Sequence, residues 1–504
     1  MAKGEQRVVV LGSGPSAFFL VRSLLKQDPR CRVTVVEAGL QPFDTLPSLG
    51  SRSSEAQPFR LDPTLNIGYG GTSQLWHNVL APLDPVDFQE RPWIPLSGWP
   101  ISMQDLENGY EAACEFFGFS YEVFRDPGRF LDLKAALSSL QFDDQVFRHK
   151  TFVHPRRYLR THIAFDALLK QESRLSVRKG AVGLRFETQG AEESLLIFDR
   201  NEGVVERIQA DRFVLCCGAI NSAEILLNSS AYAALPFLGR CLMDHPMGNY
   251  FQFRYPQKIR AKIYSGQGFS RGMAMRLAWT LTPERQAEEG LGNSAFYLRP
   301  AFAAGPEDAT ERLKLQLLTV RKKLGQFKVP LAEGWALARN LNMAAQIVQY
   351  KTGMLSSHRL TDCMFVTEQR PASESRLTLT GRENEFGNRT VSVHWALGQA
   401  DLAEAPSFHR HVTRSLMDLN GAVETFDAAQ LAWDQRLSSA AHHLGTVRMA
   451  RSAEFGCVDA DLRVFSSQKV FVCDGSVFPT AGNANPTLTC MALGARLARF
   501  LAHA

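Results

Sequence analysis

The fold is decided by residues 6–17, which read Gln6-Arg7-Val8-Val9-Val10-Leu11-Gly12-Ser13-Gly14-Pro15-Ser16-Ala17. The apolar, β-branched run at 8–11 is typical of a strand that is buried on both faces. Gly12, Gly14 and Ala17 fill the three small-residue positions of G-x-G-x-x-G/A, where the chain turns tightly, approaches a pyrophosphate and packs a helix on the strand. The stretch therefore predicts a strand–turn–helix unit that binds a dinucleotide.

The chain beyond this turn supports the same prediction. Residues 18–25 are apolar nearly all round, as in a helix that covers a central sheet, and Asp28-Pro29 ends this helix because a residue before proline leaves the helical region. A second strand at 33–36 then delivers Glu37, which is placed to accept hydrogen bonds from an adenosine ribose. A tight turn that binds nothing is the alternative. The strand, helix and acid together favour dinucleotide binding.

Composition bounds the class of protein. The chain has 504 residues, of which 45% are apolar and 21% are charged, which is enough for two domains with large cores. The net charge of +5 is mild, and no basic arm flanks the core. We therefore expect no nucleic-acid partner.

The sequence also indicates the compartment of the protein, through its apolar runs, its N-terminus and its cysteines. No apolar run reaches the ~18 residues of a spanning helix, and the first strand begins without a signal-peptide pattern. The nine cysteines, mostly inside apolar runs, are typical of reduced core residues. These features predict a cytoplasmic protein without membrane association.

A glycine-rich segment at 66–78 is a second candidate for cofactor contact. Gly70, Gly71, Thr72 and Ser73 are small residues in a row, which suit a backbone that lies against phosphates or a ring. A surface turn is the alternative. The neighbouring Trp76 argues against it, because functional loops are positioned by such anchoring contacts.

Two further units follow along the chain. Short strands at 175–178, 183–186 and 194–198 predict a small antiparallel sheet beside the nucleotide domain. Residues 211–220 form a buried strand that ends in a glycine turn, which returns the chain to the parallel sheet.

Residues 239–440 predict a second domain, because strands alternate there with amphipathic helices. Its sheet should include strands at 368–371, 375–379 and 390–395. The basic helical pattern at 309–324 fits a solvated helix face. A helix that binds a membrane surface or a partner is the alternative for this segment.

The C-terminal region carries the second group of candidate residues. His442-His443-Leu444-Gly445-Thr446 precedes a strand at 469–473, which Asp474-Gly475-Ser476 follow. A helix then runs to about residue 502, with Asn485 at its N-cap and Pro486 as its first residue. Its N-terminus carries a partial positive charge, which suits an anionic ligand such as a reduced flavin.

In this order and spacing the motifs resemble, nearly end to end, those of the glucose–methanol–choline (GMC) oxidoreductases, flavoenzymes that oxidise alcohols. The resemblance rests on Gly12/Gly14/Ala17 with Glu37-Ala38-Gly39, Gly70-Gly71-Thr72-Ser73, Asp244-His245-Pro246, His442-x-x-Gly445-Thr446, Asp474-Gly475-Ser476 and Asn485-Pro486-Thr487. Within the family the chain is most similar to pyranose-oxidase-like members and to bacterial members that oxidise sugar alcohols, including aminoglycoside hydroxyls.

The resemblance implies an α/β fold in which a Rossmann-type FAD-binding domain is built from discontinuous segments. The second, α+β domain should bind substrate and have an antiparallel sheet with covering helices. We expect the FAD-binding domain at 1–85, 165–238 and 440–504, and the substrate-binding domain at 86–164 and 239–439. Non-covalent FAD is also implied, because Leu75 stands where some relatives carry the histidine that links flavin, while His77 follows the Trp.

The resemblance further implies that His442 and Asn485 form the catalytic pair, and side-chain chemistry agrees. A histidine takes the hydroxyl proton at neutral pH while a hydride passes to flavin N5, and a second polar group holds the alcohol oxygen. The alternative for His442 is a core histidine. The alternative for Asn485 is a helix cap whose side chain binds the Leu488 amide. We expect no metal site. The expected cofactor-binding residues are Gly12, Gly14, Ser16, Ala17, Glu37, Gly70, Gly71, Thr72, Ser73, Val182, Asp474, Gly475, Pro486 and Thr487.

The favoured function is FAD-dependent oxidation of an alcohol to an aldehyde or ketone. The substrate should be a sugar, an aminocyclitol or another polyol, with oxygen or another compound as electron acceptor. A lyase of the hydroxynitrile-cleaving type on the same scaffold is the main alternative, since it needs the histidine but no flavin redox step. A flavin binder without turnover is disfavoured by the His442/Asn485 pair, and a pyridine-nucleotide dehydrogenase by Asp474-Gly475-Ser476.

Overall fold

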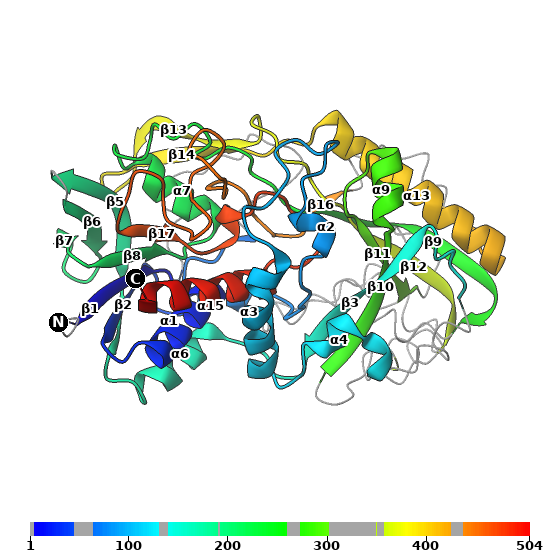
Figure 1. Ribbon diagram of the computed structural model, residues 1–504, viewed down its shortest axis with the longest axis horizontal. Helices are drawn as coiled ribbons and strands as arrows, with labels where there is room; N and C mark the ends of the chain where they lie inside the picture. Colours follow the sequence, from blue (N-terminus) through cyan, green and yellow to red (C-terminus); the bar gives the residue numbers. More distant parts are fainter. Residues whose placement is uncertain are drawn as a thin grey trace, which may run out of the picture.

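The computed structural model describes residues 5–44, 64–130, 140–189, 192–259, 273–301, 349, 357–424 and 437–503. A parallel and an antiparallel sheet lie side by side along the long axis of the molecule, with helices packed around both (Figure 1). The predicted fold class is thereby confirmed.

Five strands from distant parts of the chain form the parallel sheet. In order across the sheet they are β17 (Val470–Val472), β8 (Arg212–Leu215), β1 (Gln6–Leu11), β2 (Cys31–Glu37) and β4 (Leu175–Lys179). β1 lies at the centre because its apolar residues 8–11 are buried on both faces. The covering helices are α1 (Pro15–Gln27), α3 (Met103–Phe116), α6 (Thr161–Leu169), α7 (Ala219–Leu227) and α15 (Thr487–His503). α15 packs against both α1 and α3, so the last helix of the chain lies beside the first (Figure 1).

The antiparallel sheet belongs to the other half of the molecule. In order its strands are β15 (Val423–Glu424), β9 (Pro246–Ile259), β12 (His358–Val366), β11 (Ala295–Pro300), β10 (Met273–Leu281) and β3 (Phe147–Pro155), and β16 (Ser438–Ser439) also pairs with β9. One face packs Trp279, Phe296 and Phe365 against Phe408 of α13 (Gln399–Asn420). The opposite face is free to line a cavity. The short helices of this region are α2 (Pro85–Phe88), α4 (Glu122–Arg125) and α9 (Pro283–Glu289).

Strand pairing differs from the sequence prediction at two places. The strand at 175–178 does not join the small antiparallel sheet, which consists of β5 (Ala181–Gln189), β6 (Glu192–Asp199) and β7 (Val204–Ile208), but pairs with β2 as β4. Residues 376–394 form a separate hairpin, β13 (Arg376–Glu383) and β14 (Arg389–His394), which contacts α7, and 368–371 form no strand. Alternation within a strand does not identify its partner, because pairing is decided by tertiary contacts.

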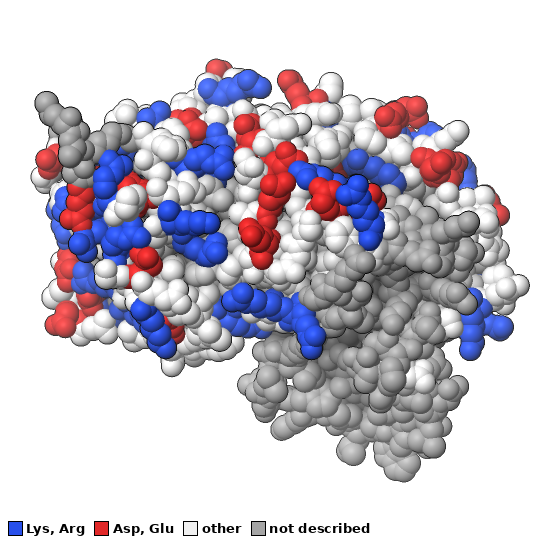
Figure 2. All heavy atoms as spheres, turned by 60° about the horizontal axis from the view of Figure 1, so that its bottom comes forward, with Lys and Arg blue, Asp and Glu red and all other residues white. Residues whose placement is uncertain are grey.

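Other predictions have simple outcomes. The basic segment 309–324 lies outside the described residues. Among the helices that are described, none is both long and apolar enough to cross a membrane. Figure 2 shows one face of the molecule. Basic and acidic side chains are interspersed over its left half, which is the half that holds the parallel sheet in Figure 1. The predicted division into two domains stays a prediction.

Candidate active site

A cavity of about 960 Å³ lies between the two sheets. The turn after β1, the end of β2 and the N-terminus of α15 line one side of it, and strands β3, β9, β10, β11 and β12 line the other. This volume lies at the upper end of the range of about 300–1,000 Å³ that is usual for ligand sites. The cavity is therefore large enough for an extended ligand.

The turn after β1 has the geometry that a dinucleotide pyrophosphate requires. Gly12 has φ +92°, and a Cβ there would lie 2.6 Å from the carbonyl oxygen of Cys216. A Cβ at Gly14 would meet nothing within 4 Å, so the backbone at this position faces open cavity. Gly71 approaches from the other side, where its Cβ would lie 3.2 Å from the Cα of Gly14. These residues fit FAD, whose phosphates would be held by this cradle at the N-terminus of α1, which begins at Pro15.

Glu37 lies at the end of β2 and lines the cavity. Its carboxylate accepts hydrogen bonds from the Ser13 hydroxyl and, at 2.7 Å, from the Gly39 amide. Burial raises the pKa of Glu37 to about 7, against the effect of these hydrogen bonds. The position fits the predicted ribose contact, which stays a prediction.

Most of the other predicted cofactor residues also line the cavity. They are Ser16, Thr72, Val182, Asp474, Gly475, Pro486 and Thr487. The Asp474 carboxylate is held by the Gly218 amide at 2.9 Å and by the Ser222 hydroxyl at 2.6 Å, and burial raises its pKa. This carboxylate therefore ties the turn after β8 to the turn after β17.

Three predicted residues lie behind the cavity wall. Ala17 is fully buried in the helix–sheet contact. Gly70 has φ +99° and accepts a hydrogen bond from the Ser73 hydroxyl at 2.6 Å, and that hydroxyl also lies 2.8 Å from Thr161 Oγ1. The contacts of Gly70 and Ser73 thus hold the loop in shape. Their contact with the cofactor remains a prediction.

The structure brings His442 and Asn485 together at the cavity. Asn485 Nδ2 lies 3.1 Å from His442 Nε2, and both residues are half-buried. The helix α15 begins at Thr487, two residues beyond Asn485, and the described contact of the Asn485 side chain is with His442 rather than with Leu488. The side chain therefore faces the histidine instead of capping the helix.

His245 fixes the orientation of His442 from behind. Its Nε2 lies 3.1 Å from the carbonyl oxygen of Ala481, and because a carbonyl only accepts, Nε2 carries the proton. Its Nδ1 is then an acceptor, 2.8 Å from Nδ1 of His442. Burial lowers the pKa of both histidines, and neutral His442 consequently donates from Nδ1 and keeps a lone pair on Nε2 toward Asn485.

Asp244 holds the backbone of both histidine segments. Its Oδ1 accepts from the amides of His245 at 2.6 Å and His442 at 2.9 Å, and Oδ2 accepts from the Ser439 hydroxyl. Atoms of Asp244, His245 and His442 lie within 4.8 Å of one another, as metal ligands would, but each is engaged in these hydrogen bonds. The expectation of no metal site stays a prediction.

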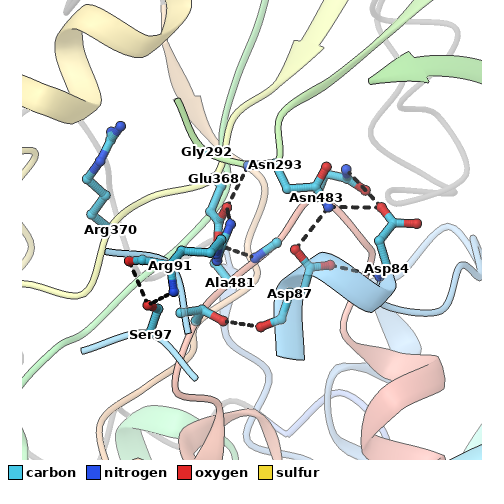
Figure 3. A network of polar contacts seen from close by, with 12 residues as sticks. Asp84, Asp87, Arg91, Ser97, Gly292, Asn293, Glu368, Arg370, Ala481 and Asn483 are labelled. Atoms are coloured by element: carbon cyan, nitrogen blue, oxygen red, sulfur yellow. Dashed lines mark hydrogen bonds and ion pairs between the residues drawn. The ribbon is translucent and has the colours of Figure 1, made fainter. Parts of the chain in front are cut away.

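A buried ionic network supports the loop at 481–483 (Figure 3). Arg91 and Glu368 are 1% and 0% exposed and form two hydrogen bonds of 2.7 and 2.6 Å. The Glu368 carboxylate also accepts hydrogen bonds from the backbone amides of Gly482 at 3.1 Å and Asn293 at 2.6 Å. Glu368 thus joins the antiparallel sheet to the loop that carries the hydrogen-bond partner of His245.

Sequence reasoning missed several residues of the site. The sequence identifies Asp244 and His245 only as part of a family motif and gives them no role. Arg276 and Arg299 on strands β10 and β11 were not singled out, although both line the cavity. The feature that could have identified them is the alternation of polar and apolar residues along a strand, since each arginine stands between apolar residues.

Comparisons with known proteins agree with this geometry. Residues 371–494 match the sequence model of the GMC oxidoreductases. The chain therefore carries a match to the C-terminal domain of the GMC oxidoreductases.

The curated relatives that the chain matches are distant. The chain is 23% identical to the 6'''-hydroxyparomomycin C oxidase of Streptomyces lividus over 67% of its own length and 54% of that enzyme. It is 29% identical to the long-chain-alcohol oxidase FAO3 of Arabidopsis thaliana over 21% of its own length and 14% of that enzyme. The chain thus spans about half, or less, of the curated relatives that it matches.

Solved structures share the whole fold. The pyridoxine 4-oxidase from Mesorbium loti is 17% identical and superposes with a TM-score of 0.57 over 100% of both chains. A formate oxidase of Aspergillus oryzae RIB40, studied for the effect of an R554A substitution on FAD modification, is 16% identical with a TM-score of 0.58 over 99% of both chains. At these identities the likeness is one of fold.

Proposed function

We propose that this protein is a GMC oxidoreductase that oxidises an alcohol to an aldehyde or ketone with FAD as cofactor. The observation that carries the proposal is the His442–Asn485 pair, 3.1 Å apart at the wall of a cavity that also holds the dinucleotide cradle. The oxidase relatives support the same class of reaction.

The two side chains suit a hydroxyl group. His442 Nε2 offers a lone pair and Asn485 Nδ2 offers an N–H donor. A hydroxyl group can donate to the first and accept from the second. An alcohol whose hydroxyl replaces the His442–Asn485 contact gives its proton to His442 while Asn485 holds its oxygen. FAD, when bound, supplies the hydride acceptor. His442 then keeps the proton at Nε2 until it passes to solvent.

The cofactor is expected to be held without a covalent bond. Leu75 and His77 both line the cavity, and Leu75 occupies the position at which some relatives carry a flavin-linking histidine. Acid precipitation of the holoenzyme should leave the yellow colour in the supernatant. Colour in the pellet would contradict this proposal and make His77 the first residue to replace.

An anaerobic screen tests the reaction class. Sugars, aminocyclitols, other polyols and aryl alcohols are mixed with the FAD-loaded enzyme, and bleaching of the flavin absorbance is recorded. A substrate of an oxidase or dehydrogenase bleaches the flavin, whereas a hydroxynitrile substrate of a lyase is cleaved without bleaching. Cleavage without bleaching would overturn the proposed function in favour of the lyase.

A further inference from the structure

The cavity face of the antiparallel sheet carries positive charge that described protein groups leave poorly matched. Arg276 and Arg299 both line the cavity from this sheet. The carboxylates among the described lining residues are Glu37, Glu224 and Asp474, and all three come from the parallel-sheet side. The substrate side of the cavity therefore presents two guanidinium groups and, among described lining residues, no carboxylate.

Both guanidinium groups hold polar atoms without hydrogen bonds. In the described part of the chain, Nε of Arg276 and both Nε and Nη2 of Arg299 are buried without a hydrogen-bond partner, although Nη2 of Arg299 forms a long ion pair with Asp362. Arg299 is 14% exposed, and its Nη2 lies 3.9 Å from Oδ2 of Asp362, too far for a hydrogen bond. Arg276 lies over the Tyr297 ring, with Cζ 4.2 Å from the ring centroid.

Arg91 shows how a carboxylate compensates a buried guanidinium in this protein, although the Nε of Arg91 also lacks a hydrogen-bond partner. The guanidinium of Arg91 is 1% exposed and makes two hydrogen bonds to Glu368. Leaving buried N–H groups of a cation without such partners costs free energy. A planar anion that accepts two hydrogen bonds is the ligand that a guanidinium binds best.

We infer that Arg276 and Arg299 bind an anionic oxygen group, a carboxylate or a phosphate, on the alcohol substrate. This inference rests on the proposed function, because it names the substrate of the same site. An anionic substrate also differs from the sugar or aminocyclitol that the sequence suggested, since a sugar is uncharged and an aminocyclitol is a cation at neutral pH.

The strand order limits where the anionic group lies on the substrate. Ser438 of β16 pairs with Met247 of β9, which places the segment that leads to His442 beside β9. β11 is two strands from β9, or about 10 Å at the usual spacing between strands. The anionic group therefore lies at the opposite end of the substrate from the reacting hydroxyl.

Matched ligands test the inference. The FAD-loaded enzyme is titrated under anaerobic conditions with 4-(hydroxymethyl)benzoate, 4-(hydroxymethyl)phenyl phosphate and the neutral 4-(hydroxymethyl)benzamide, and Kd is read from the change in the flavin spectrum. At least one anion should bind about 10-fold or more tightly than the amide, because a charge-assisted hydrogen bond contributes that much. The tighter anion identifies the group.

Three variants complete the test. Arg276→Gln and Arg299→Gln should each weaken binding of the favoured anion by about 10- to 100-fold and leave the amide within about twofold. Arg254→Gln removes an exposed charge from β9 of the same sheet and should change neither. Equal binding of amide and anions, equal losses for all ligands, or a loss of FAD from the arginine variants would each overturn the inference. If the anions bind selectively but no alcohol bleaches the flavin, the anion site is supported. The proposed oxidation is then contradicted.

Discussion

His245 and His442 face each other through their Nδ1 atoms at 2.8 Å, although 197 residues separate them in the chain. His245 is fully buried and bound to the Ala481 carbonyl through Nε2. The pair therefore sets which nitrogen of His442 is free to accept a proton, as a hydrogen bond to one ring nitrogen determines the role of the other.

Replacement of His245 tests this role. His245→Ala leaves the Nδ1–H of His442 without an acceptor, so we expect the rate of anaerobic flavin reduction to fall by about 10- to 100-fold, or about 1.4 to 2.7 kcal/mol of barrier. FAD content should be unchanged. His394→Ala, at an exposed position of β14, is the control. A His245→Ala rate and pH profile equal to those of the wild type would refute the positioning role.

The pH dependence of reduction follows from the pKa of His442. Burial and the neighbouring His245 hold this pKa well below its usual value of about 6.5. The neutral, proton-accepting form therefore persists on acidification, and the reduction rate should stay constant as the pH falls to about 6.5 and decline only below it. Stopped-flow measurements across this range would contradict the assignment if the rate were already halved above pH 6.5.

Prediction from sequence succeeded where the signal was local. Gly12, Gly14 and Glu37 belong to one strand–turn–helix–strand unit, whose apolar runs and small residues are contained within 37 positions. The pairing of β4 with β2 depends on contacts between distant segments, which no local period encodes. The same reason explains why the role of His245 was missed, since only the folded chain brings it to His442.

Three tryptophans could, from the sequence alone, either stack against a sugar or belong to the core, and only contacts between distant segments decide between these roles. Trp93, Trp99 and Trp395 were equally compatible with sugar stacking and with the core. Their indole N–H groups bind Leu291 O, Thr480 Oγ1 and Gln369 Oε1, and none of the three rings lines the cavity. They are structural residues.

Glu37 should determine FAD affinity. Glu37→Ala removes an acceptor for the ribose hydroxyls, so we expect binding of FAD to the apoprotein to weaken by about 10- to 100-fold. Because the pKa of Glu37 is raised to about 7, its ionised form increases as the pH rises through this value, and wild-type affinity should increase with it. The variant should lack this pH dependence. Equal affinities, measured by fluorescence titration, would contradict the ribose contact.

The Arg91–Glu368 ion pair should dominate the stability of the loop at 481–483. Arg91→Met leaves a fully buried carboxylate uncompensated, so the free energy of unfolding should fall by about 3 to 5 kcal/mol. Arg125→Met breaks exposed ion pairs with Glu107 and Glu122 and should cost less than about 1 kcal/mol. Urea denaturation of the holoenzyme measures both values, and similar losses in the two variants would contradict the expected difference.

The catalytic pair makes the strongest prediction. His442→Ala should lower the rate of flavin reduction by about 10² to 10⁴, the usual contribution of a positioned general base, equal to about 3 to 5 kcal/mol of barrier. Asn485→Ala should lower it less, because this side chain only holds the alcohol oxygen.

The double variant shows whether His442 and Asn485 act together on one hydroxyl or independently. Because His442 and Asn485 contact each other at 3.1 Å and act on one hydroxyl, their effects should not add, and the double variant should be about as slow as His442→Ala. Anaerobic stopped-flow with the best alcohol of the screen measures all three rates, and absorbance confirms that each variant retains FAD. Additive losses would indicate that the residues act separately, and a wild-type rate in FAD-loaded His442→Ala would exclude His442 as the base.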